Sequence, residues 1–334
     1  MENSLTEDNF KPHPLLWNGH LQTIIPSKLK RPLPGDWDNV REMRFQLFDG
    51  SEVSCRYLER NLAAPTLFIL HGMGGSNRSR YILGLMERSR PQGWNVFCPS
   101  MYDISETKRK PTVFHSGCSR MIDDLLKKAA RKLEFGEVLL SGVSMGGNII
   151  LKMIGEWGGA LPENVKGAAV ISPLVDLPGS ADKMEQHSTF IYRHSFLKKL
   201  RATMVRQAVR YQHYADLERV NRARTLRQFD AAFTAPLSGF ASVDEYYSTQ
   251  GSEAVLEDIS IPTCIVHSLD DPVLTSRALH TGGAVNNPEI TVCLTRKGGH
   301  VGFLSARPEG ERGSYWAENR VIDFLDRVST IPGT

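Results

Sequence analysis

The feature that most constrains the fold is a series of short apolar runs separated by segments with helical spacing. The clearest run is residues 64–70, APTLFIL. A continuous apolar run of this length is typical of a strand buried on both faces of a sheet. Similar runs cover residues 94–100, 137–140, 165–174, 262–268 and 289–295. Strands that alternate with helices predict an α/β fold, in which helices cover both faces of a mostly parallel sheet.

Two further strands, residues 43–48 and 52–58, precede this series and bring the expected sheet to eight strands. The alternation breaks over residues 180–255, where the pattern is mostly helical. There Leu197, Leu200, Met204, Ala208 and Tyr211 fall on one helical face. We interpret 180–255 as a helical cap inserted into a core of residues 41–179 and 256–334, with 1–40 as an extension packed on that core.

Composition excludes several classes of protein. Five cysteines without a CxxC pair argue against a disulfide framework or a zinc cluster, and they favour a reducing compartment. The acidic, polar start is unlike a signal peptide, and no apolar run approaches the roughly 20 residues that cross a bilayer. We therefore expect a cytoplasmic protein. The sequence GMGGS, residues 72–76, matches neither a phosphate-binding loop nor a dinucleotide site, so no cofactor is expected.

The net charge of +3 is too small to indicate nucleic-acid binding, but the charge is unevenly spread. Residues 182–228 hold eleven Lys or Arg against four Asp or Glu, a local charge of +7. This basic stretch is either the solvated face of amphipathic helices or a surface that attracts an anionic headgroup or a membrane. Oligomeric state is not predicted.

The sequence GVSMG, Gly142 to Gly146, fits the pattern G-x-S-x-G. An expected strand, EVLL, precedes it and an expected helix, NIILKMIGEW, follows it. In that context the pattern predicts a strained turn that presents the serine hydroxyl above the edge of the sheet. Ser144 is therefore the expected nucleophile, with a merely tight turn as the alternative.

A serine hydroxyl needs a base to remove its proton and an acid to orient the base, here in the chain order Ser, Asp or Glu, His. His300 follows the last expected strand and is the candidate base. Asp270 and Asp271 both follow the preceding strand. We favour Asp271, because comparable loops place the orienting carboxylate last, just before a short turn; Asp176 is a third candidate.

The oxyanion of an acyl-transfer intermediate needs two N–H donors. The backbone of Met145, directly after the nucleophile, is expected to supply one. The loop after residues 66–70 should supply the other, from Met73 or, as the alternative, Gly74. His71 in the same loop is expected to brace it, because this histidine precedes the nucleophile in the chain.

One segment fits none of these elements. Residues 13–26, HPLLWNGHLQTIIP, precede any recognisable strand or helix. His13 and His20 have no neighbouring Cys or carboxylate to complete a metal site. We expect the aliphatic and aromatic side chains of this segment to pack along the core and help to form the wall of an acyl pocket. These side chains are Leu15, Leu16, Trp17 and Leu21.

Taken together, the motifs resemble the YheT-like branch of the α/β-hydrolases, whose animal relatives include lipases and phospholipases. The resemblance rests on HPLLWNGHLQTI, HGMGGS, HSGCS, GVSMGGN, FDAAFTAPLSGFASVDEYYSTQGS, DDPV and GGHVGF, which occur in the expected order. It implies the α/β-hydrolase fold and a Ser144–His300–Asp271 triad. It also implies hydrolysis of short acyl esters or acylglycerols without a cofactor. Alternatives are an acyltransferase or thioesterase with the same triad, or a binding protein that keeps the fold without turnover.

Overall fold

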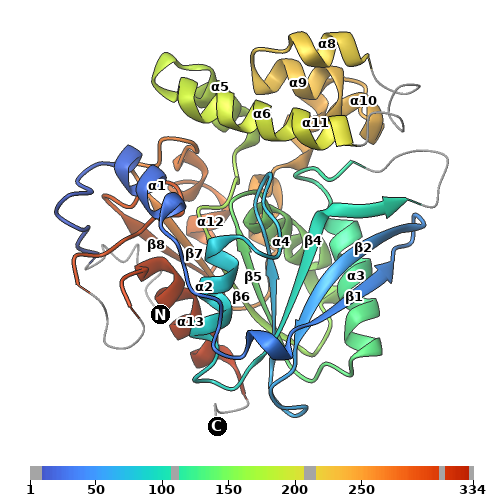
Figure 1. Cartoon of the computed structure of the whole chain (residues 1–334), viewed down its shortest axis with the longest axis vertical. Coiled ribbons are helices and arrows are strands. Elements are labelled where there is room, and N and C mark those ends of the chain that lie inside the picture. The colour runs from blue at the N-terminus through green and yellow to red at the C-terminus, as the bar shows by residue number, and fades with distance from the viewer. Residues whose placement is uncertain (1–9, 107–112, 207–215, 308–312, 331–334) are drawn as a thin grey trace.

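The computed structural model describes residues 10–106, 113–206, 216–307 and 313–330. Its strands form one eight-stranded sheet with the order β1-β2-β4-β3-β5-β6-β7-β8 (Figure 1). β2 runs antiparallel to β1 and β4, and the neighbours from β4 to β8 pair in parallel. The predicted mostly parallel sheet is therefore confirmed.

The strands lie close to the predicted apolar runs. Their bounds are Arg41–Gln46 (β1), Ser51–Leu58 (β2), Thr66–Leu70 (β3), Asn95–Glu106 (β4), Val138–Val143 (β5), Val165–Ile171 (β6), Thr263–Ser268 (β7) and Ile290–Thr295 (β8). Every residue of β3, β5 and β7 is buried, as expected for strands covered on both faces.

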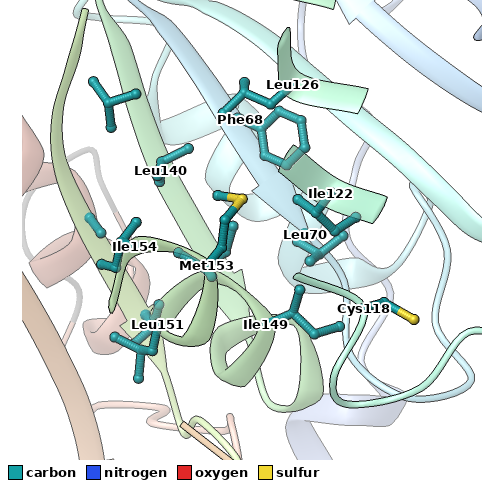
Figure 2. Close-up of a cluster of buried hydrophobic side chains, with 14 of the residues drawn as sticks. Phe68, Leu70, Cys118, Ile122, Leu126, Leu140, Ile149, Leu151, Met153 and Ile154 are labelled. Atoms are coloured by element: carbon teal, nitrogen blue, oxygen red, sulfur yellow. The ribbon is translucent and has the colours of Figure 1, made fainter. Parts of the chain in front are cut away.

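Helices cover both faces of the sheet (Figure 1). On one face, α3 (Ser119–Lys132) and α4 (Met145–Trp157) pack against β3 and β5. Figure 2 shows this part of the core, where Ile122, Ile149 and Met153 meet Phe68 and Leu140. On the other face, α2 (Arg80–Arg88) packs against α13 (Trp316–Val328). Between β7 and β8 lie a 3-10 turn, Arg277–Leu279, and the short α12 (Gly283–Asn286).

A layer of helices lies above the sheet, in the part of the chain for which the sequence predicts a cap (Figure 1). Its helices are α5 (Leu177–Glu185), α6 (Phe190–Arg206), α8 (Leu217–Arg222), α9 (Leu226–Ala232), α10 (Thr234–Ser238) and α11 (Val243–Gln250). Of the predicted apolar face, Leu197, Leu200 and Met204 join a cluster with Val220 and Phe229, while Ala208 and Tyr211 lie outside the described residues. No helix within the described ranges is long and apolar enough to span a bilayer. The division of the chain into extension, core and cap stays a prediction.

The N-terminal segment contains a helix that the sequence reasoning missed. α1 spans Gly19–Lys28, and the side chain of Asn18 caps it by accepting a hydrogen bond from the Leu21 N–H. Asparagine is among the preferred capping residues because its side-chain oxygen satisfies one of the free N–H groups of the first turn. The prediction for the apolar side chains is also wrong in part. Leu16 is buried, but Leu15 is 75% and Trp17 62% exposed.

Candidate active site

Ser144 occupies a strained turn between β5 and α4. Its φ of 56° and ψ of −121° lie outside the regions that a residue with a side chain normally adopts. The neighbouring glycines make this turn possible. A Cβ on Gly146 would lie 2.4 Å from the carbonyl oxygen of Leu70, and a Cβ on Gly142 would lie 2.5 Å from that of Gly146. The turn therefore needs both glycines of the G-x-S-x-G pattern.

The structure brings Ser144, His300 and Asp271 together in a hydrogen-bonded chain. His300 Nδ1 lies 2.8 Å from Asp271 Oδ2, and His300 Nε2 lies 3.1 Å from Ser144 Oγ. When Nδ1 carries the proton and donates to Asp271, Nε2 is free to accept the proton of the serine hydroxyl. The three loops meet because β5, β7 and β8 are parallel strands of one sheet, so that their carboxyl ends share an edge.

Asp271 is held as a buried, ionised carboxylate. Burial alone raises the pKa of Asp271, but the neighbouring His300 and the hydrogen bond to it, with smaller effects of His267 and the Leu274 backbone, bring that pKa below its ordinary value. Asp271 Oδ1 accepts from the N–H groups of Val273, at 2.7 Å, and Leu274, at 2.9 Å. These bonds leave Oδ2 to His300.

The two alternative acids have other partners. Asp270 Oδ1 accepts a hydrogen bond of 2.8 Å from the Gly299 N–H, and burial raises the pKa of the Asp270 carboxyl. Asp176 caps α5 by accepting from the Gly179 N–H at 2.8 Å, and it pairs with Arg277. Neither contacts His300 through a hydrogen bond that the structure records, so the geometry favours Asp271.

Two segments of backbone lie near Ser144: the start of α4 and the loop after β3. Met145 is the first residue of α4, so its N–H has no carbonyl partner in the helix. The backbone of the loop after β3 lies close to the Ser144 side chain, since a Cβ on Gly72 would lie 3.6 Å from Ser144 Oγ. Burial raises the pKa of the Tyr102 phenol, and a hydrogen bond with the Gly74 backbone partly offsets that rise. Met73, with Gly74 as the alternative, stays a prediction for the second donor.

His71 links the loop after β3 to the backbone of β4 through both of its ring nitrogens. Its Nε2 accepts from the Met101 N–H at 3.0 Å, and its Nδ1–H donates to the carbonyl oxygen of Gly72 at 2.8 Å. Burial lowers the pKa of His71 to about 4, so that the ring is neutral near pH 7. Tyr81, which the sequence did not single out, accepts from the Gly72 N–H through its hydroxyl.

Other residues at the site were also missed. Lys183 of α5 donates to the carbonyl oxygens of Asp271 and Leu274, at 2.6 and 2.9 Å. Thr23 of α1 accepts a hydrogen bond of 2.8 Å from the His300 N–H. Asn18, as a helix cap, is the only sequence signal that could have led to α1. Among the described residues, no three His, Cys, Asp or Glu side chains come together as metal ligands would.

Comparisons with known proteins identify the fold family of the chain. A family model for the alpha/beta hydrolase fold matches residues 65–306. YheT of Escherichia coli (strain K12), whose name marks it provisionally as an esterase, is 28% identical over 319 residues, which cover 92% of this chain and 90% of YheT. Phospholipase ABHD3 of Homo sapiens is 25% identical over 342 residues, which cover 96% of this chain and 77% of that protein.

Among solved structures, the esterase Pf2001 of Pyrococcus furiosus has the same fold. It superposes with a TM-score of 0.58 at 14% identity and covers 90% of this chain and 97% of its own. The family model covers most of the chain, and YheT and ABHD3 are similar along nearly all of it. The chain therefore belongs to the alpha/beta hydrolase fold family, as its resemblance to the YheT-like branch predicted.

Proposed function

We propose that this protein hydrolyses carboxylic esters through an acyl-enzyme on Ser144. The observation that carries the proposal is the hydrogen-bonded chain from Asp271 through His300 to Ser144, with the serine on a strained turn. A nucleophile, a base within reach of its proton and a carboxylate that orients the base are the parts that acyl transfer needs.

In the first half of the reaction, Ser144 Oγ attacks the ester carbonyl while His300 Nε2 takes the hydroxyl proton. His300 then returns that proton to the leaving alcohol as the C–O bond breaks. Asp271 stabilises the imidazolium that forms between these two events. In the second half, His300 takes a proton from water, the water oxygen attacks the acyl carbonyl, and Ser144 regains its proton as the acid leaves.

The negative charge on the carbonyl oxygen forms near the start of α4. The N–H groups of Met145 and Met73 are the proposed donors to this oxyanion. Each such donor typically contributes about 3 kcal/mol to transition-state stabilisation. The helix dipole of α4 adds positive potential at the same end.

We propose short-chain acyl esters or acylglycerols as substrates, in line with the esterase and phospholipase names of similar proteins. We further propose that the protein is cytoplasmic. We also propose that its cap contacts lipid surfaces. Phe190 and Ile191 are 58% and 65% exposed at the start of α6, and the same helix carries the basic Arg193 and Lys198. Exposed apolar side chains beside cations are typical of helices that bind at membrane surfaces.

The decisive experiment is active-site titration with a fluorophosphonate, which reacts with an activated serine. We expect one label per chain in the wild type and none in Ser144→Ala. Ser260→Ala, which removes an exposed hydroxyl bonded only to the Gly158 carbonyl, should be labelled like the wild type. A wild type that is not labelled, or equal labelling of Ser144→Ala, would contradict the proposed function.

A further inference from the structure

The loop that carries the proposed base contains two residues with side chains in a strained backbone conformation, Val301 and Phe303. This base loop, residues 298–304, includes Gly299 with a φ of 61°, Val301 with 67° and Phe303 with 40°. Positive φ is rare for a residue with a side chain and is most unfavourable for a β-branched one such as Val301. A conformation of this kind persists only where the surrounding structure imposes it. The question is which residues impose it here.

Side chains from outside the loop accept its backbone N–H groups. The Gly299 N–H donates to Asp270, the Val301 N–H to Ser172 Oγ, and the Phe303 N–H closes a turn within the loop. Two further N–H groups of the base loop donate to side chains of α1. The His300 N–H donates to Thr23 Oγ1 at 2.8 Å, and the Leu304 N–H donates to Gln22 Oε1 at 2.8 Å.

Both α1 side chains are themselves held in place. Gln22 is fully buried, and its Nε2 donates back to the carbonyl oxygens of Leu304, at 3.0 Å, and Leu16, at 3.3 Å. The Thr23 hydroxyl donates to the Gly19 carbonyl at 2.6 Å, which directs its lone pairs toward His300. Because each acceptor is fixed by a second bond, the hydrogen bonds define one position for the base loop.

The backbones of α1 and the catalytic loops also approach too closely for side chains. A Cβ on Gly302 would lie 1.7 Å from the Gln22 carbonyl oxygen, and one on Gly299 would lie 2.4 Å from that of Gly19. A Cβ on Gly19 would lie 1.8 Å from the carbonyl oxygen of Asp270. α1 is thus fitted against the loops of both the base and the acid.

We propose that α1 is a positioning element for the general base, in which Thr23 and Gln22 hold the base loop so that His300 faces Ser144 and Asp271. This inference rests on the proposed ester hydrolysis, because it assigns the residues that align its base. Neither residue touches the reacting atoms, so they act through His300. Misalignment of a catalytic group by about 1 Å can cost as much as about 100-fold in rate.

The test compares Thr23→Val, which keeps the shape and removes the acceptor, with Thr23→Ser, which keeps the hydroxyl. Ser27→Ala is the matched control, because Ser27 is a hydroxyl on the same helix that bonds only to the Ile24 carbonyl. For each protein, kcat and KM are measured from pH 5 to 9 with a short-chain p-nitrophenyl ester, together with the midpoint of thermal unfolding.

We expect Thr23→Val to lose about tenfold or more in kcat with KM within about twofold of the wild type. A looser His300–Asp271 bond favours the imidazolium less, so the acid limb of the rate profile should also move to lower pH. Thr23→Ser should restore both, and Ser27→Ala should match the wild type. If Thr23→Val does not fold, Thr23→Ala is judged by the same criteria.

Three results would overturn the inference: wild-type kcat and pH profile in Thr23→Val, an equal loss in Thr23→Ser, or a loss that follows the unfolding midpoint with no shift of the acid limb. Failure of the proposed function looks different. In that case the wild type itself neither hydrolyses the ester nor takes up the fluorophosphonate label.

Discussion

At the scale of single residues, the site separates two neighbouring carboxylates by the groups that surround them. Asp271 faces His300 and accepts two backbone N–H groups of its own turn. Asp270 points to the base loop and accepts the Gly299 N–H. In the proposed mechanism, one carboxylate therefore orients the base itself, and the other holds the backbone that carries the base.

This difference predicts that the same substitution, Asp to Asn, reduces kcat to very different extents at the two positions. Asp271→Asn presents His300 with an amide that favours the wrong tautomer, and we expect kcat to fall by about 10⁴. Asp270→Asn keeps an Oδ1 acceptor for the Gly299 N–H, so kcat should change by less than about tenfold. Steady-state kinetics on an ester substrate measures both. A larger loss in Asp270→Asn than in Asp271→Asn would show that the acid was assigned wrongly.

At the scale of elements, the cap is tied to the loop that carries the acid. Lys183 of α5 donates to the carbonyl oxygens of Asp271 and Leu274. Val273 and Leu274 also pack with Met184 of the cap and Tyr192 of α6. The layer of helices above the sheet is therefore connected to the catalytic loops directly, as well as through the chain.

Removing this connection should destabilise the protein. Lys183→Met keeps the length of the side chain and loses two charge-assisted hydrogen bonds, so the free energy of unfolding should fall by about 1.5–3 kcal/mol. Denaturant unfolding measures the change. The control is Lys198→Met at an exposed position of α6, which should change it by less than about 0.5 kcal/mol. Equal effects of the two variants would show that the hydrogen bonds of Lys183 to the Asp271 loop do not stabilise the protein.

At the scale of the whole molecule, buried histidines make stability depend on pH. Burial lowers the pKa of His71 to about 4, and it lowers the pKa of His267 to about 4 against the opposing effect of Asp271. A histidine whose pKa falls on folding contributes stability at pH values above 6.5, its ordinary pKa. That contribution is lost as the pH falls toward the folded-state value.

His267 allows this contribution to be measured alone. When the pH is lowered from 7 to 4, the free energy of unfolding should fall less in His267→Leu than in the wild type. The difference should be about 3 kcal/mol, as expected for a pKa shift of this size. His194→Leu, at an exposed position, should follow the wild type. Denaturant unfolding at both pH values gives the comparison, and parallel curves for all three proteins would contradict the prediction.

The exposed apolar side chains at the start of α6 predict how the molecule binds a lipid surface. Co-sedimentation with anionic phospholipid vesicles should exceed that with zwitterionic ones, because the cap is basic. The double variant Phe190→Ser and Ile191→Ser should bind the anionic vesicles more weakly than the wild type. Leu62→Ser is the control, since Leu62 is 71% exposed just before β3, at the edge of the sheet opposite the site. Unchanged binding in the double variant would exclude this surface.

Much of the molecule follows from local patterns in the sequence. Apolar runs of strand length predicted six of the eight strands, and the G-x-S-x-G pattern between a strand and a helix predicted the position of Ser144. Both signals are local, because burial on two faces and the steric demands of a tight turn act on residues that are neighbours in the chain. The expected chain order of nucleophile, acid and base followed from the fold in which this pattern occurs.

What only the tertiary structure decided depends on contacts between distant parts of the chain. The sequence by itself left Asp270 and Asp271 as neighbours with the same chemistry, and their roles differ because of a loop 29 residues away. For residues 13–26 it predicted packing along the core, but it did not indicate a contact with the loop of His300. Thr23 meets His300 across 277 residues, through a hydrogen bond between a side chain and the backbone. Neither hydropathy nor helical periodicity records such a bond, because it depends on how the folded segments are placed against one another.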